Sequence, residues 1–333
     1  MFDHIRLFRR FLTTAVLVAA TGAAAAEHNW TVDGSELRVT TPCARHVTIE
    51  PSSSLKGKIE VEARADHQEE IDQLRITGGS VATVTRKEDS CWMPGPNLQV
   101  GKVHIGVSHE PTLEMTVKVP QAINIAIKEG ASGDYHIGAV DGTLRLELHG
   151  SGSVEAETAK ELSLSLTGSG DAHIEQVAGR IEGKISGSGD LEIAKANVAS
   201  TNLTITGSGG ADIGQGDVGA VTVYLHGSGK FSGPAAAGDV KVESSGSSSF
   251  SLHSVTAANA SVRVTGNGDI ELGEGSIGSL VVSSTGSADV RIEAVVTDAD
   301  LSTRGSGDME LRKVTGKLSR NERGSGKIRV DGK

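Results

Sequence analysis

An aspartate directly follows a Gly-Ser-Gly-type turn at six places in the chain. These are Asp134, Asp171, Asp190, Asp269, Asp289 and Asp308. Two carboxylates about 5 Å apart can hydrolyse a glycosidic bond with retention of configuration, and several carboxylate oxygens together can hold Ca²⁺. Both chemistries require that the fold bring aspartates from successive turns close together.

The same aspartates also fit a purely structural role, because Asp favours tight turns through hydrogen bonds of its own side chain. An active site occurs once, whereas this acid recurs from turn to turn, and Lys230 and Lys327 replace it in two of them. Calcium-binding β-rolls also have a shorter, nine-residue period. We therefore predict no catalytic residue and no cofactor. The alternative metal candidates are Asp171, Asp190, Asp269, Asp289 and Asp308.

Serine occupies the middle of most of these turns, and His149 and His226 each directly precede one. A nucleophilic serine needs an adjacent base and a group that orients this base. The two histidines are four turns apart, about 19 Å if successive turns stack at the spacing of β-strands, so they cannot share one site. We interpret the serines as a row of hydroxyls. We interpret His104 and His109 as surface residues.

The turns recur at a nearly constant spacing. They begin at residues 150, 168, 187, 207, 227, 246, 266, 286, 305 and 324, with a degenerate copy at Ala131. A fixed period of about 20 residues is typical of a solenoid, in which each unit buries its apolar side on its neighbours. Of the 43 glycines, 34 lie between residues 131 and 333, many of them in these turns.

Apolar residues alternate on both sides of each turn. Examples are Leu144, Leu146 and Leu148 ahead of one turn, and Leu191 and Ile193 behind another. A period of two indicates strands, so each repeat is a strand, a tight corner, a second strand and a looser turn. The predicted fold is all-β, a right-handed parallel β-helix with coils of about 19 residues.

A narrow aliphatic interior also accounts for the small number of aromatic residues. After residue 26 there are six, and both remaining phenylalanines, Phe231 and Phe250, occupy inward positions of the repeat. We expect Tyr224 to be the exposed aromatic residue of the repeats. Few exposed aromatic rings argue against an extensive platform for stacking sugars.

The chain divides into three parts. Residues 1–26 combine three arginines, a short apolar run and an Ala-rich end, which predicts a signal peptide cleaved near Ala26. Residues 27–130 lack the period and are predicted to be a β-rich N-terminal cap or opening coils. Residues 131–333 form the repeats, and the last coil carries Arg320 and Glu322 at inward positions. Such polar residues are expected to end the stack.

The cysteines and the charge restrict the location and the partners. Cys43 and Cys91 are the two cysteines, and in an oxidising compartment they are expected to form a disulfide. Without the leader, 29 Lys and Arg face 41 Asp and Glu, which argues against binding to nucleic acid. No later segment is long and apolar enough to span a membrane. The sequence indicates no oligomeric state.

The chain resembles a bacterial family of adhesin-like proteins, the head GIN domain family, from about Arg45 to beyond Gly229. The likeness rests on residues 113–120, on Ile123 to Ile127 and on the serial Gly-Ser-Gly-Asp turns that follow. The resemblance implies an exported β-solenoid of the bacterial envelope without an established enzymatic role.

We therefore predict a non-enzymatic scaffold in the periplasm or at the cell surface that binds an envelope or surface protein or a glycan. The alternatives are a polysaccharide-acting enzyme that uses clustered corner aspartates and a scaffold stabilised by divalent cations.

Overall fold

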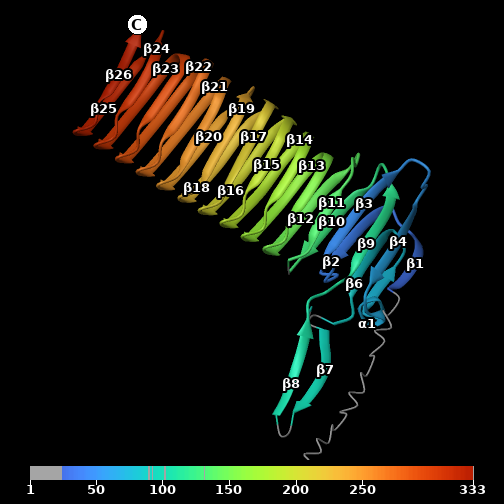
Figure 1. Cartoon of the computed structure of the whole chain (residues 1–333). Coiled ribbons are helices and arrows are strands. Elements are labelled where there is room, and N and C mark those ends of the chain that lie inside the picture. Colours follow the sequence, from blue (N-terminus) through green and yellow to red (C-terminus); the bar gives the residue numbers. More distant parts are fainter. Residues whose placement is uncertain (1–24, 89–90, 92, 101–102, 131, 333) are drawn as a thin grey trace, which may run out of the picture.

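The computed structural model describes residues 25–88, 91, 93–100, 103–130 and 132–332. The predicted signal peptide therefore lies almost entirely outside the described residues. The described chain forms a long rod of stacked strands with a more irregular N-terminal end, from which a hairpin projects (Figure 1).

The N-terminal part contains ten strands and one short helix within the described residues. They are β1 (Ala26–Asp33), β2 (Glu36–Thr40), β3 (His46–Ser52), β4 (Lys58–Ala65), α1 (Gln68–Asp72), β5 (Leu74–Thr77), β6 (Val81–Arg86), β7 (Met93–Val100), β8 (Val103–His109), β9 (Glu114–Pro120) and β10 (Asn124–Glu129). Strands β7 and β8 form the projecting hairpin, a two-stranded antiparallel sheet of their own.

The rod continues as a regular stack to the C-terminus. Its strands are β11 (Asp134–Ile137), β12 (Thr143–Gly150), β13 (Val154–Gly168), β14 (Ala172–Gly187), β15 (Leu191–Asn197), β16 (Ser200–Gly207), β17 (Gly210–Asp217), β18 (Ala220–Gly227), β19 (Lys230–Ala236), β20 (Val240–Gly246), β21 (Ser249–Gly266), β22 (Ile270–Gly286), β23 (Val290–Gly305), β24 (Met309–Val314), β25 (Leu318–Gly324) and β26 (Ile328–Gly332).

Each coil has a leading strand, which runs into the Gly-Ser-Gly corner, and a trailing strand, which leaves it. Leading strands pair in parallel with leading strands of the next coil, as Leu144 with Leu162, and trailing strands pair likewise, as Val154 with Ala172. Register shifts fall within trailing strands or at the looser second turn, for example between Ala159 and Glu161. The predicted β-solenoid with a spacing of about 19 residues is thus confirmed. Its right-handed coil stays a prediction.

The interior is a continuous apolar core that runs from Leu37 to Ile328. Phe231 and Phe250 are buried and stack with their ring centroids 5.1 Å apart, so the predicted inward positions of both rings are confirmed. Gly233 lies beside the Phe231 ring and has no side chain to compete for this space. The narrow interior therefore accepts an aromatic ring where a neighbouring inward residue is reduced to a hydrogen atom.

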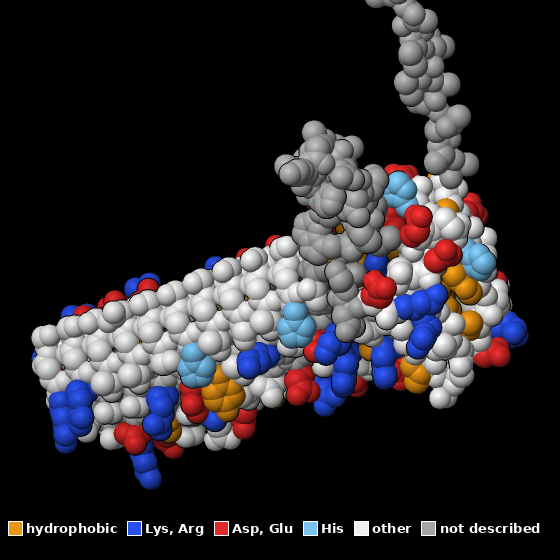
Figure 2. Space-filling view, turned by 90° about the horizontal axis from the view of Figure 1, so that it is seen from below, with side chains coloured by type: hydrophobic (Ala, Val, Ile, Leu, Met, Phe, Trp, Pro, Cys, Tyr) orange, Lys and Arg blue, Asp and Glu red, His pale blue; other side chains and the backbone are white. Residues whose placement is uncertain are grey.

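The first glycine of each corner is required by the backbone. Gly187 has a φ of +127°, and a Cβ at this position would collide with the carbonyl oxygen of Gly168 in the preceding coil. This close approach allows Ser188 N–H to donate to the Gly168 carbonyl at 2.9 Å. Because only glycine combines this φ with this spacing, the repeated glycines set the corner. Figure 2 shows the corners as a pale strip along the rod, with charged side chains on both sides.

Coils also form in the N-terminal part, but in an order that differs from the sequence. Strand β2 lies between β6 and β10, and β3 lies between β9 and β11. The stack therefore runs from the β6–β9 coil to the β2–β3 coil and then to the β10–β11 coil. The predicted division at residue 130 falls in the corner of this last coil, so residues 27–130 contain both opening coils and a cap.

The cap covers the outermost coil with antiparallel strands. Strand β4 pairs with β9, β1 pairs with β4, and β5 pairs with β6. The apolar side chains of this layer, including Ile59, Val61 and Ile71, are buried against the coil. The carboxylate of Glu70 is also fully buried, and accepts hydrogen bonds from Thr112 Oγ1 at 2.6 Å and Thr112 N–H at 2.8 Å. These contacts tie helix α1 to the segment that begins β9.

Candidate functional site

The corner aspartates are engaged by the backbone of the next coil. Asp171 Oδ1 accepts the N–H of Asp190 at 2.8 Å, and Asp190 Oδ1 accepts the N–H of Gly210 at 2.6 Å. In the C-terminal coils Asp289 accepts the N–H of Asp308 at 2.8 Å. Each carboxylate thus supplies an acceptor to one backbone donor along the rod axis, which is a structural role.

Coils without a corner aspartate provide an internal comparison. Gly210 and Lys230 occupy the aspartate position in two successive coils. There the N–H of Lys230 donates to the carbonyl of Gly209 at 3.3 Å, and the N–H of Ser249 donates to the carbonyl of Gly229 at 3.2 Å. A backbone carbonyl therefore takes the place of the carboxylate in these coils. The aspartate gives a shorter hydrogen bond at the same position, and this structural role accounts for it without any part in catalysis.

The metal candidates do not converge on a common point. Within the described residues, no group of three or more His, Cys, Asp or Glu side chains is arranged to hold a metal ion. Asp308 is the most engaged of them, since it accepts Lys327 N–H at 2.7 Å and Arg329 Nη1 at 2.8 Å. These hydrogen bonds lower the pKa of Asp308. Asp269 occupies the same corner position, and its carbonyl accepts the N–H of Phe250 at 2.9 Å.

A second set of aspartates at the looser turn has the same role and was missed by the sequence reasoning. Asp239 Oδ1 accepts the N–H of Asn259 at 2.9 Å, and Asp298 Oδ1 accepts the N–H of Lys317 at 2.7 Å. Asp217 Oδ1 accepts the N–H of Gly219 at 2.7 Å and that of Ala237 at 3.2 Å. The signal that could have found them is an acid about 20 residues before each accepted donor.

The corner serines, His149 and His226 lie on the surface. Ser287 and Ser306 are hydrogen-bonded through their hydroxyls at 2.9 Å, and His226 Nδ1 lies 2.8 Å from the Ser245 hydroxyl. His149 and His226 are four coils apart in the register of the leading strands, so they share no site. The side chains of His104 and His109 are not among those that the structure describes, so their surface position stays a prediction.

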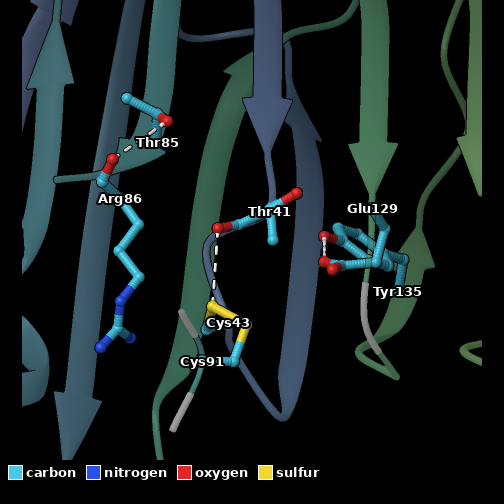
Figure 3. Close-up of a disulfide and its surroundings, with 7 residues drawn as sticks. All are labelled: Thr41, Cys43, Thr85, Arg86, Cys91, Glu129 and Tyr135. Carbon is cyan, nitrogen blue, oxygen red and sulfur yellow. Dashed lines mark hydrogen bonds between the residues drawn. A yellow bond between two sulfur atoms is a disulfide. The ribbon is translucent and has the colours of Figure 1, made fainter. Parts of the chain in front are cut away.

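Cys43 and Cys91 form a disulfide with a Cα–Cα distance of 5.3 Å. Cys43 lies in the corner of the β2–β3 coil and has a φ of +55°. The first glycine of the corners in the repeats also has a positive φ. The bond joins this corner to the segment that leads into the β7–β8 hairpin (Figure 3). The disulfide thus fastens an insertion of the outermost coil to the coil beneath it.

Buried polar groups line the interior next to this disulfide. Arg86 and Glu129 are buried, and the half-buried Thr41 occupies the corresponding position in the coil between them (Figure 3). Glu129 accepts a hydrogen bond of 2.5 Å from the Tyr135 hydroxyl, and burial together with this carboxylate raises the pKa of Tyr135. In the next coils leucine occupies this position, at Leu148 and Leu166. At the N-terminal end of the rod, buried polar residues are therefore limited at this position to the coils next to the cap.

The outward-facing side chains of the leading strands form one face of the rod, which we call the leading face. Tyr224 is the centre of a polar cluster on this face. Lys241 Nζ lies 5.0 Å from the centre of the Tyr224 ring and donates to its hydroxyl at 3.0 Å. Glu243 forms an ion pair with the same Lys241, with 2.9 Å between Oε1 and Nζ. The hydrogen bond to Tyr224 raises the pKa of Lys241. Tyr224 itself is half-buried.

Comparisons with known proteins place these features in context. The chain is similar in fold to solved structures described as a putative adhesin from Bacteroides fragilis, with 13% identity and a TM-score of 0.27, and as a putative adhesin from Parabacteroides merdae, with 12% identity and a TM-score of 0.32. A structure described as a putative lipid binding protein from Parabacteroides distasonis matches with 13% identity and a TM-score of 0.29. Each alignment covers 92% of this chain and 95% to 97% of the other. The search of curated proteins found no match.

Helix α1, with five residues, is the one helix among the described residues, and no helix there has the length and apolar character needed to cross a membrane. A family model matches residues 32–235 and again residues 221–333. The two matches together cover residues 32–333, which include most of the cap and all repeats. The protein therefore belongs to the family described as "Putative auto-transporter adhesin, head GIN domain".

Proposed function

We propose that this protein is an exported, non-enzymatic binding rod of the bacterial envelope, and that its leading face binds a glycan. The family assignment supports an adhesin-like role. The engagement of the corner aspartates by backbone N–H groups argues against the alternative of a polysaccharide-cleaving enzyme. The observation that carries the proposal is the cluster around Tyr224.

An aromatic ring binds a sugar through its face, and nearby polar groups orient the hydroxyls. Tyr224 offers such a face. Lys241, on the following coil, lies against the ring from the C-terminal side. On the N-terminal side the neighbouring residue in register is Thr204, and because its side chain is short we expect this side of the ring to be accessible to a sugar.

The surroundings of Tyr224 supply polar groups and hold the ring in place. The Tyr224 hydroxyl accepts from Lys241, so its own proton is free to be donated to a ligand. Glu243 is the neighbour of Tyr224 in register on the following coil, and His226 lies two positions further along β18, where its Nδ1 is 2.8 Å from the Ser245 hydroxyl. Because the ring is already fixed by Lys241, little side-chain entropy is lost when a ligand binds.

A glycan array with the mature protein, residues 27–333, tests this proposal. We expect selective binding to a subset of glycans and a loss of at least about tenfold in affinity for Tyr224→Ala, about the value of one stacked aromatic contact. Tyr224→Phe should retain most of the affinity. Arg263→Ala is the matched control, since Arg263 lies in the same row two coils further along.

Two results would contradict the proposal. One is equal binding by the parent and by Tyr224→Ala, and the other is capture of envelope proteins without binding to any glycan. Cleavage of a glycan that is abolished by Asp171→Asn with Asp190→Asn would instead support the enzymatic alternative.

A further inference from the structure

A hollow of about 730 Å³ lies on the leading face near the cap, away from Tyr224. It extends over strands β2, β10, β12, β13 and β14. Figure 2 shows Lys and Arg side chains gathered where the rod meets the cap. From this hollow we infer that the leading face carries a binding notch for the carboxylate of an acidic saccharide. The inference rests on the proposed glycan binding and specifies the class of glycan.

The floor of the notch is set by one small residue. Ala126 lies in register with Arg38 on one neighbouring coil and with Arg145 on the other. The two arginines are therefore two coil steps apart, about 10 Å between their Cα atoms. A methyl group between two long guanidinium side chains leaves a depression with a positive group on each side.

Arg145 is the cation that remains available for a ligand. Arg38 is paired with Glu36 at 3.2 Å, and Lys128 is paired with Glu147 at 2.8 Å. Within the part of the chain that the structure describes, Arg145 makes no ion pair, and its neighbours in register are Ala126 and Ser163. A planar guanidinium presents two parallel N–H donors that match the two oxygens of one carboxylate.

The surrounding acids define what kind of anion fits. Glu36, Glu147 and Glu161 are engaged by Arg38, Lys128 and Arg180, and Glu182 lines the hollow two coils from Arg145 in register. Hydrogen bonds from Lys128 and His149 lower the pKa of Glu147, so it stays ionised. A densely charged polyanion would meet these carboxylates and the net negative charge of the chain. A single carboxylate on an otherwise neutral ligand meets Arg145 and the open floor at Ala126. This pattern fits a uronic-acid type of sugar.

The notch and Tyr224 lie on the same face of the rod. In the register of the leading strands Arg145 and Tyr224 are four coils apart, about 19 Å. One oligosaccharide running along the rod could therefore place a ring on Tyr224 and a carboxylate in the notch. The notch would add selectivity for acidic chains to a contact that Tyr224 makes with neutral and acidic chains alike.

Isothermal titration of the mature protein with a neutral galacto-oligosaccharide that carries one terminal galacturonic acid, and with the neutral galacto-oligosaccharide of equal length, tests the inference. We expect the acidic chain to bind about tenfold tighter, the value of one charge-assisted hydrogen bond. Ala126→Glu, which places a carboxylate on the floor, and Arg145→Gln should each remove this preference and leave the affinity for the neutral chain unchanged. Val281→Glu is the matched control, because exposed Val281 occupies the same row on a distant coil.

The two levels of the proposal fail in different ways. If Tyr224→Ala weakens both ligands while Ala126→Glu and Arg145→Gln still prefer the acidic chain, the notch is wrong and glycan binding stands. Equal affinity of the parent protein for the two chains also overturns the notch. If the parent protein binds neither these chains nor any glycan of the array, both the notch and the proposed function are overturned.

Discussion

The two ends of the rod are closed in different ways. A stack of parallel strands exposes unpaired N–H and C=O groups at each end. At the N-terminal end, the antiparallel strands β4 and β5 pair with the outermost coil and cover these groups. At the C-terminal end, Glu322 Oε1 accepts the N–H of Ile328 at 2.9 Å, and Arg320 Nη1 donates to the Ile328 carbonyl at 3.3 Å.

The difference shows two solutions to one problem. The N-terminal closure uses strands β1, β4 and β5, helix α1, a disulfide and a rearranged strand order. The C-terminal closure uses two charged side chains at positions that are apolar or small in earlier coils, since Arg320 pairs in register with Leu301 and Glu322 with Thr303. A repeat protein can thus end its stack by changing two residues of the last coil, whereas the start of this stack is built as a separate structure.

The largest expected effect concerns the C-terminal end. Replacing Arg320 and Glu322 together by Val continues the apolar interior to the last coil and frees the Ile328 N–H and carbonyl. We expect end-to-end association at micromolar concentration, because an open apolar edge pairs with another edge. Light scattering after size exclusion measures the mass. Asn321→Val, on the outward side of the same strand, should keep the parent mass, and an unchanged mass for the double variant would show that other residues close this end.

The disulfide is expected to stabilise the cap. Cys43→Ser with Cys91→Ser opens a loop of 48 residues, which lowers the free energy of unfolding of the cap by about 4 kcal/mol on the chain-entropy model. Both tryptophans, Trp30 and Trp92, lie in the N-terminal part, so urea unfolding followed by tryptophan fluorescence reports on the cap. Adding a reductant should shift the parent protein and leave the double variant unchanged. Coincident curves for parent and variant would contradict this role.

Replacing a corner glycine of the rod by alanine should lower the free energy of unfolding more than replacing a glycine of the cap. Gly187→Ala combines a positive φ with a collision against the Gly168 carbonyl, and we expect a loss of about 2–4 kcal/mol. Gly57 in the cap has a φ of +68° with open space around the Cβ position, so Gly57→Ala should cost about 1 kcal/mol. Urea unfolding followed by far-ultraviolet circular dichroism measures both. Equal losses would mean that stacking of the corners contributes nothing beyond their backbone conformation.

The smallest effect is the response of the last coils to acid. The backbone N–H of Lys327 and the Arg329 guanidinium lower the pKa of Asp308 in the folded protein. The stabilisation is therefore present above the ordinary pKa of Asp and is lost as the pH falls through the lowered pKa of the folded state. Asp308→Asn should reduce the loss of thermal stability on acidification relative to the parent. Asp300→Asn, on the leading face, is the control, and an identical acid response of parent and Asp308→Asn would refute this contribution.

Much of the repeat region could be predicted from the sequence because its contacts are local. Residues about 19 positions apart lie side by side, so the corners, the inward Phe231 and Phe250 and the outward Tyr224 follow from the spacing alone. The same spacing places Arg145 beside Ala126. Arg38, the other side of the notch, could not be found in this way, because it reaches Ala126 from a coil that is 88 positions earlier in the chain.

The sequence by itself determined the coil, its period and its interior, because each coil contacts the next one along the chain. Only the tertiary structure decided the order of the opening coils, since strands β2 and β3 pair with partners far away in sequence and no period marks these pairings. It also decided the role of the corner aspartates. Their spacing brings them close, but the direction of each carboxylate, toward a backbone N–H of the next coil, depends on how the coils stack.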